Sequence, residues 1–343
     1  MNLAARMKPV SPKRFISAHS IRLFGLAFLA VIAWASPRSF SQQSIDVDKA
    51  AALLQAGETE KACQAYHALL TAKPANPEAE AGEVTCSEQL ALKARANGDL
   101  NGALQYLLQA RDVVPHNSRL LYDLGILEDQ MHLYKDADLS LDAAGKLDPT
   151  DSRIWYASGR VKMDLGQLDL AKEKLAAYLA VHPEDATAHY GLGRAYQLGL
   201  QFDKARTEFQ RSISLQAAQT EGYYQLGDIA LHEGEFDESI ANFEKTLVRN
   251  PKHGGALAGI GEAYFKEKKY DKALEYLRRA VAAASDYQPG HYYLGLTLAR
   301  LGKQEESKQE LSIAEKLADD ENRKSSQHLQ LNPAVEEPNA RNR

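Results

Sequence analysis

A small set of residues recurs every 34 positions through most of the chain, and this period constrains the fold more than any other feature. One slot of the period holds glycine in six consecutive copies: Gly125, Gly159, Gly193, Gly227, Gly261 and Gly295. A second slot holds alanine or serine: Ala103, Ala137, Ala171, Ala205, Ser239, Ala273 and Ser307. A third holds a large apolar residue: Leu107, Leu141, Leu175, Phe209, Phe243, Leu277 and Leu311. A fixed period of this length is typical of a helical solenoid, whose units contact only their neighbours.

The copy at residues 220–253 shows that each unit is a pair of amphipathic helices. Its first half spaces small and apolar residues at i, i+3, i+4 and i+7: Tyr223, Leu226, Gly227 and Ala230. A turn is predicted around Gly234, and Pro251 ends the second helix. Equivalent turns are expected at Gly98, Gly166 and Gly302. Helix N-caps are predicted at Asn117, Asp151 and Asp185, since these side chains accept hydrogen bonds from first-turn amides.

These in-phase residues resemble the tetratricopeptide repeat family over roughly residues 43–321. The resemblance implies an all-α fold: a right-handed α-solenoid of antiparallel helix pairs with a concave inner groove. It also implies binding of a protein or peptide rather than catalysis. We therefore expect about eight repeats in a solenoid over residues 42–321, with the glycines of one helix facing the alanine and serine slot of the other. Seven extra residues, 77–83, are expected to lengthen one helix.

The two ends of the chain depart from the repeat. Residues 23–35 form an apolar run that follows a basic segment and ends in an A-x-A-like site, which is the layout of a secretory signal peptide. This run has 13 residues, whereas a membrane-spanning helix needs about 20. We therefore expect residues 1–41 to be a signal peptide of an exported, bacterial-type protein, periplasmic or extracellular. The alternative is a membrane anchor at residues 21–35. Residues 322–343 are expected to be a disordered tail, and self-association at this C-terminal edge is left open.

Charge and motifs disfavour several classes of function. The chain has a formal charge of −5, and basic residues gather in residues 1–41, so the repeats are more acidic than this total. An acidic repeat region argues against nucleic-acid binding, which depends on Lys and Arg patches. The sequence contains no P-loop, nucleophile-elbow, dinucleotide or zinc-protease motif. We therefore expect no enzyme, no cofactor and no metal.

Two sets of residues are candidates for partner binding. The first, here called the tyrosine row, occupies one slot of the repeat with a single interruption at Ala258: Tyr122, Tyr156, Tyr190, Tyr224 and Tyr292. In the tetratricopeptide repeat family this slot faces the concave side, and tyrosine offers an apolar face and a hydroxyl to a peptide. The second, here called the charged row, lies four residues further along: Arg160, Arg194, Asp228 and Glu262. The opposing explanations, repeat packing for the tyrosines and solvated helix surface for the charges, stay open.

Cys63 and Cys86 are the only cysteines. Both lie a similar number of residues from a corner at residues 74–77, so two antiparallel helices joined there would bring them to about the same height. A disulfide is favoured in an exported chain. Two separate buried thiols are the alternative.

The function that these features favour is a scaffold or adaptor that binds a protein or peptide along the groove. A membrane-tethered assembly factor for a cell-envelope complex is the main alternative. An enzyme or ligand receptor on the same scaffold is a third, for which no sequence motif argues.

Overall fold

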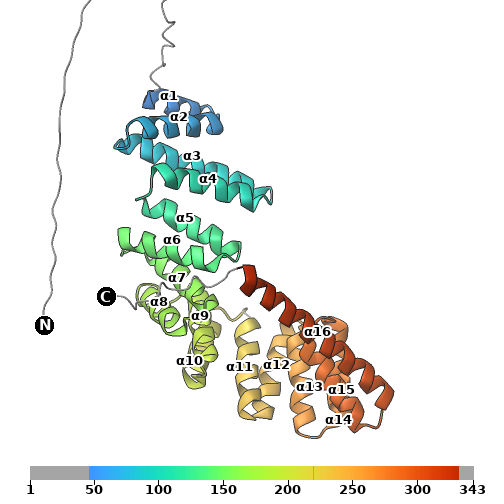
Figure 1. Ribbon diagram of the computed structural model, residues 1–343. Coiled ribbons are helices and arrows are strands. Elements are labelled where there is room, and N and C mark those ends of the chain that lie inside the picture. Colours follow the sequence, from blue (N-terminus) through green and yellow to red (C-terminus); the bar gives the residue numbers. More distant parts are fainter. Residues whose placement is uncertain (1–45, 219, 332–343) are drawn as a thin grey trace, which may run out of the picture. The chain divides into compact units, whose positions relative to one another are not determined.

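The computed structural model describes residues 46–218 and 220–331. Within these ranges the chain is all-α and forms sixteen helices, paired antiparallel in chain order (Figure 1). The helices are α1 Val47–Gln55, α2 Thr59–Ala72, α3 Pro77–Ala96, α4 Leu100–Val113, α5 Ser118–Gln130, α6 Tyr134–Leu147, α7 Ser152–Asp164, α8 Leu168–Val181, α9 Ala186–Leu198, α10 Phe202–Leu215, α11 Thr220–Glu233, α12 Phe236–Arg249, α13 Gly254–Lys266, α14 Tyr270–Ala283, α15 Gln288–Arg300 and α16 Gln304–Leu331.

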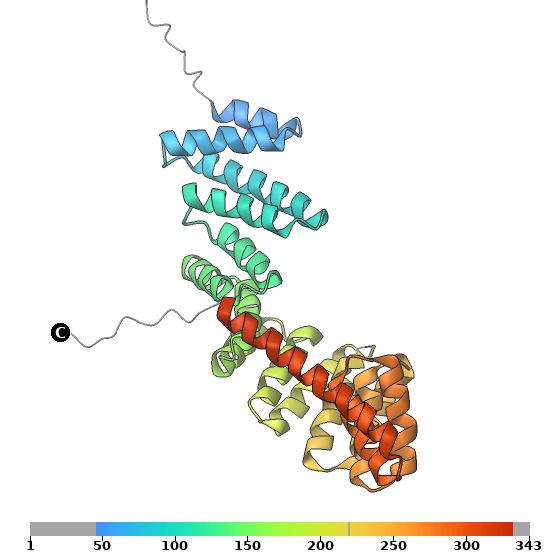
Figure 2. The same cartoon turned by 45° about the vertical axis from the view of Figure 1, so that its right-hand side comes forward.

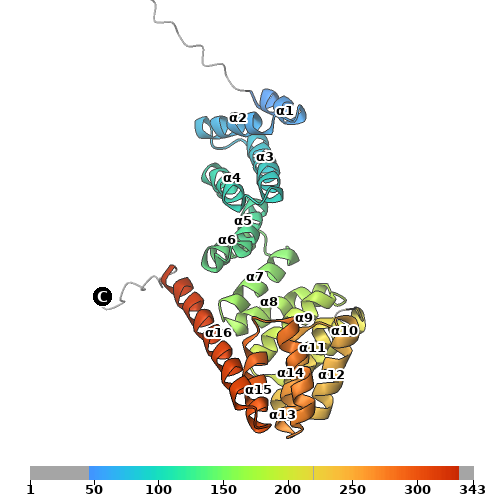
Figure 3. The same ribbon diagram turned by 90° about the vertical axis from the view of Figure 1, so that its right-hand side faces the viewer.

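Packing runs between neighbours in chain order, as expected of a solenoid. Each odd-numbered helix packs on the even-numbered helix that follows it, and each even-numbered helix packs on the first helix of the next pair (Figure 2). Odd-numbered helices also contact the next odd-numbered helix, for example α13 and α15 (Figure 3). Each pair therefore covers the apolar faces of its neighbours, which one pair alone would leave exposed to water.

The predicted caps are confirmed. Asn117 accepts a hydrogen bond from the Leu120 amide at the start of α5, and Asp151 accepts one from the Arg153 amide at the start of α7. Asp185 accepts hydrogen bonds from two amides in the first turn of α9. These side chains satisfy backbone N–H groups that have no partner inside the helix, which fixes where each first helix begins.

Every turn inside a repeat contains one residue with positive φ. Five of these residues are glycines: Gly57, Gly98, Gly166, Gly234 and Gly302. The other three turns place His132, Leu200 and Lys268 in the same conformation, with φ of 60°, 56° and 66°. A side chain disfavours this conformation by about 1 kcal/mol or more. The turn geometry is therefore imposed by the packing of the two helices and does not depend on glycine.

The glycine slot lies against the alanine and serine slot, as expected, and it also faces the large apolar slot, which was not expected. A Cβ added to Gly227 would lie 2.7 Å from Cδ1 of Phe243, and one added to Gly159 would lie 2.7 Å from Cγ of Leu175. The serine slot contacts the glycine backbone, since Ser239 Oγ donates to the Gly227 carbonyl over 2.9 Å. The large side chain fills the space of the missing Cβ, while the small residue lets the two backbones approach.

Two helices are longer than the others. Helix α3 has 20 residues, which confirms that residues 77–83 lengthen a helix. Helix α16 has 28 residues and continues ten residues past the predicted repeat boundary at 321, so residues 322–331 are helical rather than a disordered tail. Arg, Lys and Gln in this stretch are strong helix formers, which explains the extension. Residues 332–343 lie outside the described residues, and self-association at this edge stays a prediction.

The described helices contain no segment that is both long and apolar enough to cross a bilayer. The signal peptide or anchor predicted in residues 1–41 lies outside the described residues.

Substituting Gly227 with leucine should separate α11 from α12, because even a Cβ overlaps the Phe243 ring. We expect the free energy of unfolding to fall by about 3 kcal/mol or more. Thermal and denaturant unfolding followed by circular dichroism measure this change.

The matched control is Gly145→Ala in α6, where a Cβ would lie 3.5 Å from Cγ2 of Ile154, an ordinary contact. This control should be neutral or stabilising by up to about 1 kcal/mol, because alanine favours a helix over glycine. Equal unfolding midpoints for Gly227→Leu and the unsubstituted protein would contradict the close contact.

Candidate functional site

The tyrosine row lies on five odd-numbered helices; three of its rings pack against an aromatic ring on an even-numbered helix, and a fourth is covered by an arginine of α7. Tyr190 lies 5.6 Å from Phe209 between ring centroids, and Tyr224 lies 5.6 Å from Phe243. Tyr156 lies 5.1 Å from Tyr178. The Arg153 guanidinium covers the Tyr122 ring at 5.2 Å. These half-buried rings are therefore part of the repeat packing, and a role in partner contact would use only their outer edges.

Tyr292 differs from the other members of the row. Its side chain is 42% exposed, and its ring meets Tyr293 edge-on at 5.3 Å. Of the five tyrosines it is the one with enough free surface to lie against a partner without any rearrangement.

The gap in the row at Ala258 is filled by an aromatic residue that sequence reasoning missed. Tyr287, which precedes α15, packs against the buried cluster that contains Ala258. Its hydroxyl accepts a hydrogen bond from Tyr224. The Tyr224 ring also lies 4.7 Å from His253. Tyr287 occupies the helix-cap slot, 34 residues after His253, where the other repeats place Asn117, Asp151 and Asp185, so the period marked the position as a cap and not as an aromatic contact.

Members of the charged row are tied to neighbouring repeats through two glutamines. Arg194 donates to Gln225 Oε1 over 3.1 Å, and Gln225 in turn donates to the Tyr190 hydroxyl over 3.2 Å. Gln197 donates to Asp228 Oδ2 over 2.9 Å. Arg194 also donates to Gln197 over 3.3 Å. The structure thus joins Tyr190, Arg194 and Asp228 in one hydrogen-bonded group across α9 and α11, in which the glutamines were not predicted.

The two ends of the charged row have other partners. Arg160 Nη2 lies 3.2 Å from Asp129 Oδ2, and the arginine side chain is 49% exposed. Glu262 accepts a hydrogen bond from the Tyr293 hydroxyl over 2.8 Å and pairs with Lys266 over 2.8 Å. The row is therefore basic at Arg160 and Arg194 and acidic at Asp228 and Glu262, and each charge is held in place by a neighbour.

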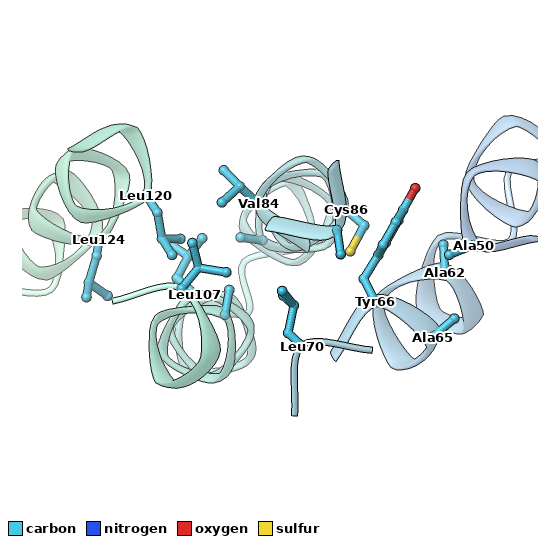
Figure 4. Packing of buried hydrophobic residues seen from close by; sticks show 14 of the residues in the cluster. Ala50, Ala62, Ala65, Tyr66, Leu70, Val84, Cys86, Leu107, Leu120 and Leu124 are labelled. Atoms are coloured by element: carbon cyan, nitrogen blue, oxygen red, sulfur yellow. The ribbon is translucent and has the colours of Figure 1, made fainter. Parts of the chain in front are cut away.

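Cys63 and Cys86 are joined by a disulfide between α2 and α3, with their Cα atoms 5.6 Å apart. Figure 4 shows Cys86 beside Tyr66 in the buried cluster formed by the first helices. Tyr66 is packed tightly there, because its ring occupies the space that a side chain at position 82 would need. The bridge thus fastens the first repeat to the second.

The described residues contain no group of three or more His, Cys, Asp or Glu side chains placed to hold a metal ion. Cys63 and His67, which lie four residues apart on α2, therefore belong to no larger set of ligands in these residues.

A pair of carboxyl groups lies between α3 and α5. Burial raises the pKa of Glu88 to about 7, and the nearby charge of Asp123 raises it further, while Arg119 opposes the shift. Arg119 also forms an ion pair with Glu88. Because each charge of this group has a partner on the adjacent helix, the pair acts as a link between repeats.

Glu128 is a buried carboxyl group whose pKa is shifted mainly by burial. It lies in α5, is 4% exposed, and its Oε2 has no hydrogen-bond partner among the described residues. Burial raises its pKa to about 7, although a hydrogen bond with Ser140 lowers it. In the unfolded chain a glutamate titrates near about 4.3. The folded state therefore binds this proton more tightly than the unfolded state.

The stability that this proton provides is present below about pH 4.3 and is lost as the pH rises through about 7. We expect Glu128→Gln to flatten the pH dependence of unfolding in this window. At pH 8 it should raise the free energy of unfolding by on the order of 1–2 kcal/mol. Urea unfolding at several pH values measures this, with exposed Glu244→Gln as the control. Parallel curves for Glu128→Gln and the unsubstituted protein would show that the carboxyl is not buried.

Comparison with known proteins gives one family and a group of similar folds. Models of the tetratricopeptide repeat match residues 94–161, 156–222 and 224–289, which together exceed half of the chain. No curated protein sequence matches.

Several solved structures have similar folds. A tetratricopeptide repeat protein from Parabacteroides merdae is 19% identical, with 68% of this chain and 93% of that chain covered and a TM-score of 0.58. The pilF protein of Pseudomonas aeruginosa is 16% identical, with coverage of 62% and 96% and a TM-score of 0.51. The Cut9–Hcn1 hetero-tetramer of APC/C is 16% identical, with coverage of 76% and 50% and a TM-score of 0.55. At these identities the likeness concerns the fold.

Proposed function

Because the chain belongs to the tetratricopeptide repeat family, whose domains generally mediate protein–protein interactions, we propose that it is a scaffold that binds a protein or peptide along the tyrosine row. The observation that carries this proposal is the repetition of a fixed aromatic side chain at one slot of successive repeats. Tyr190 and Tyr224 are held by contacts with Phe209 and Phe243, so their exposed edges offer contact area at little cost in conformational entropy.

The order of charges in the charged row favours a partner that is acidic at one end and basic at the other. Arg160 and Arg194 lie on α7 and α9, whereas Asp228 and Glu262 lie on α11 and α13. A bound segment with acidic residues beside the first two and basic residues beside the last two would match this order. Such complementarity raises the association rate and selects the direction in which the segment lies.

The test is photo-crosslinking from position 292 in the native compartment, followed by mass spectrometry of the captured protein and titration of that partner. We expect Tyr156→Ala with Tyr190→Ala to weaken binding by about tenfold or more, since an aromatic anchor contributes about 1–2 kcal/mol. Tyr292→Ala and Arg160→Ala should each weaken it severalfold, and both side chains are exposed enough for removal without loss of packing.

Leu139→Ala with Val248→Ala is the control, because these side chains are 70% and 80% exposed on even-numbered helices. An unchanged set of captured partners and unchanged affinity in the tyrosine variants would reject the tyrosine row as the binding surface.

We further propose that the protein is exported, on the basis of residues 1–41, with an anchor at residues 21–35 as the alternative. A disulfide between Cys63 and Cys86 fits an oxidising compartment. Fractionation followed by non-reducing mass spectrometry should find a salt-soluble chain that lacks its first residues and has no free thiol. An intact N-terminus in the membrane fraction would favour the anchor and the envelope assembly role, and two free thiols would reject the disulfide in the native compartment.

A further inference from the structure

A cavity of about 560 Å³ lies beside the disulfide, on helices that precede the tyrosine row. Its walls come from α2, α3 and α4, and they include Cys63, His67, Glu83, Leu90, Tyr106 and Asp112. Pockets for small ligands usually measure about 300–1,000 Å³ and combine an apolar wall with a few polar groups. The cavity has both the size and this mixed lining.

Glu83 is the unusual group in this wall. Its side chain is 4% exposed, yet among the described residues its side-chain partner is His67 alone, whose Nδ1 lies 3.4 Å from Oε1. The other oxygen, Oε2, is buried and has no hydrogen-bond partner among the described residues. Burial raises the pKa of Glu83, and the hydrogen bond with His67 opposes this effect. A buried carboxylate with one weak partner is costly unless a second charge compensates it.

The repeat register explains why the Glu83 carboxyl does not bind the first-turn backbone N–H groups that a capping side chain binds. Position 83 lies 34 residues before Asn117, and the slot continues through Asp151 and Asp185, all of which cap a helix. In the second repeat the helix starts at Pro77 and is capped by Asn76, so Glu83 lies inside the helix rather than at its N-terminus. The amides that a capping side chain would bind are already used by the helix. The insertion therefore turns a capping position into a buried acidic group.

The charges around the cavity are mainly negative. Glu60, Glu83 and Asp112 all line it, and His67 is the only lining residue able to carry a positive charge. Lys93 lies 3.9 Å from Glu60 at the exposed edge. The described residues offer no set of ligands for a metal ion. Leu90, Tyr106 and the disulfide add apolar and aromatic surface, which a hydrated inorganic cation would not use.

We propose that this cavity binds an organic cation, a guanidinium or ammonium group on an apolar stem, with Glu83 as its counter-ion. The cation can come from a free small molecule or from a basic side chain of a bound protein, since both carry the same group. Tyr106 offers its ring to the stem or to the cation. This site uses α2, α3 and α4, so it does not depend on the tyrosine row.

Calorimetric titration of the protein with agmatine, N-acetylarginine amide and N-acetylcitrulline amide tests the proposal. We expect the two cations to bind saturably and the neutral citrulline compound to bind at least about tenfold more weakly. Glu83→Gln should lower the affinity for agmatine by about tenfold or more, because it removes the charge and keeps the shape. No saturable binding, equal affinity for the citrulline compound, or an unchanged affinity in Glu83→Gln would overturn the proposal.

Glu78→Gln is the matched control, since Glu78 is exposed, lies on the same helix and does not line the cavity. It should leave the affinity unchanged. If Glu83→Gln does not fold, Asp112→Asn at an exposed position of the wall replaces it, with an expected loss of about two- to threefold. An unchanged affinity in Asp112→Asn would then overturn the proposal.

Two further experiments complete the test. The first distinguishes a protein side chain from a free small molecule as the source of the cation, and the second tests whether the cavity acts independently of the tyrosine row. An arginine-containing peptide that binds at least about tenfold more tightly than agmatine would identify a protein side chain as the source, and the reverse order would identify a free small molecule. The variant with Tyr156→Ala and Tyr190→Ala should bind agmatine normally, so failure of the tyrosine row would leave this result intact. Loss of agmatine binding in that variant would contradict a separate site.

Discussion

The close contact between glycine on one helix and leucine or phenylalanine on its partner determines the geometry of six consecutive repeats. A Cβ at Gly193 or Gly227 would lie 2.7 Å from the facing phenylalanine ring, so only glycine allows the two helices their observed separation. Glycine within a helix costs about 0.5–1 kcal/mol. Burial of a phenylalanine such as Phe209, which is fully buried, offsets that loss, since it contributes about 1.5–3 kcal/mol. The same spacing then sets the slots that carry the tyrosine row and the charged row.

The sequence predicted those parts of the fold that depend on the period alone. The all-α solenoid, the caps at Asn117, Asp151 and Asp185, and the lengthened α3 follow from local spacing and helix chemistry. What the period could not predict is which side chain occupies a given space. A side chain on a helix leans toward the N-terminus, so the residue that fills the gap above a glycine lies one turn further along the partner helix than the small residue we expected there. Helix α16 continues past residue 321, further than the repeat pattern indicates, because the pattern ends before the helix does.

The sequence predicted on which helices the candidate site residues lie, but not which residues they hydrogen-bond. The tyrosines and charges lie at the expected slots of odd-numbered helices, but Gln197, Gln225 and Tyr287 complete their hydrogen bonds. These residues interact between repeats, and a pattern within one repeat contains no information on such pairs. Their bonds also change how the surface works. Side chains that are already held by neighbours lose little entropy when a partner arrives, although they offer it fewer free hydrogen-bonding groups.

The disulfide between α2 and α3 restrains one end of the repeat stack against unfolding, and the other end has no such bond. A stack whose units are stabilised only by adjacent units loses structure from its termini inward, because a terminal unit has one neighbour instead of two. The covalent bond holds the first repeat to the second and opposes this loss at the amino-terminal end, because it restricts the unfolded chain there. Among the described residues, the helix pairs at the α16 end have no such covalent restraint. Reduction of the Cys63–Cys86 bond would remove the covalent restraint at the amino-terminal end, so that both ends could lose structure.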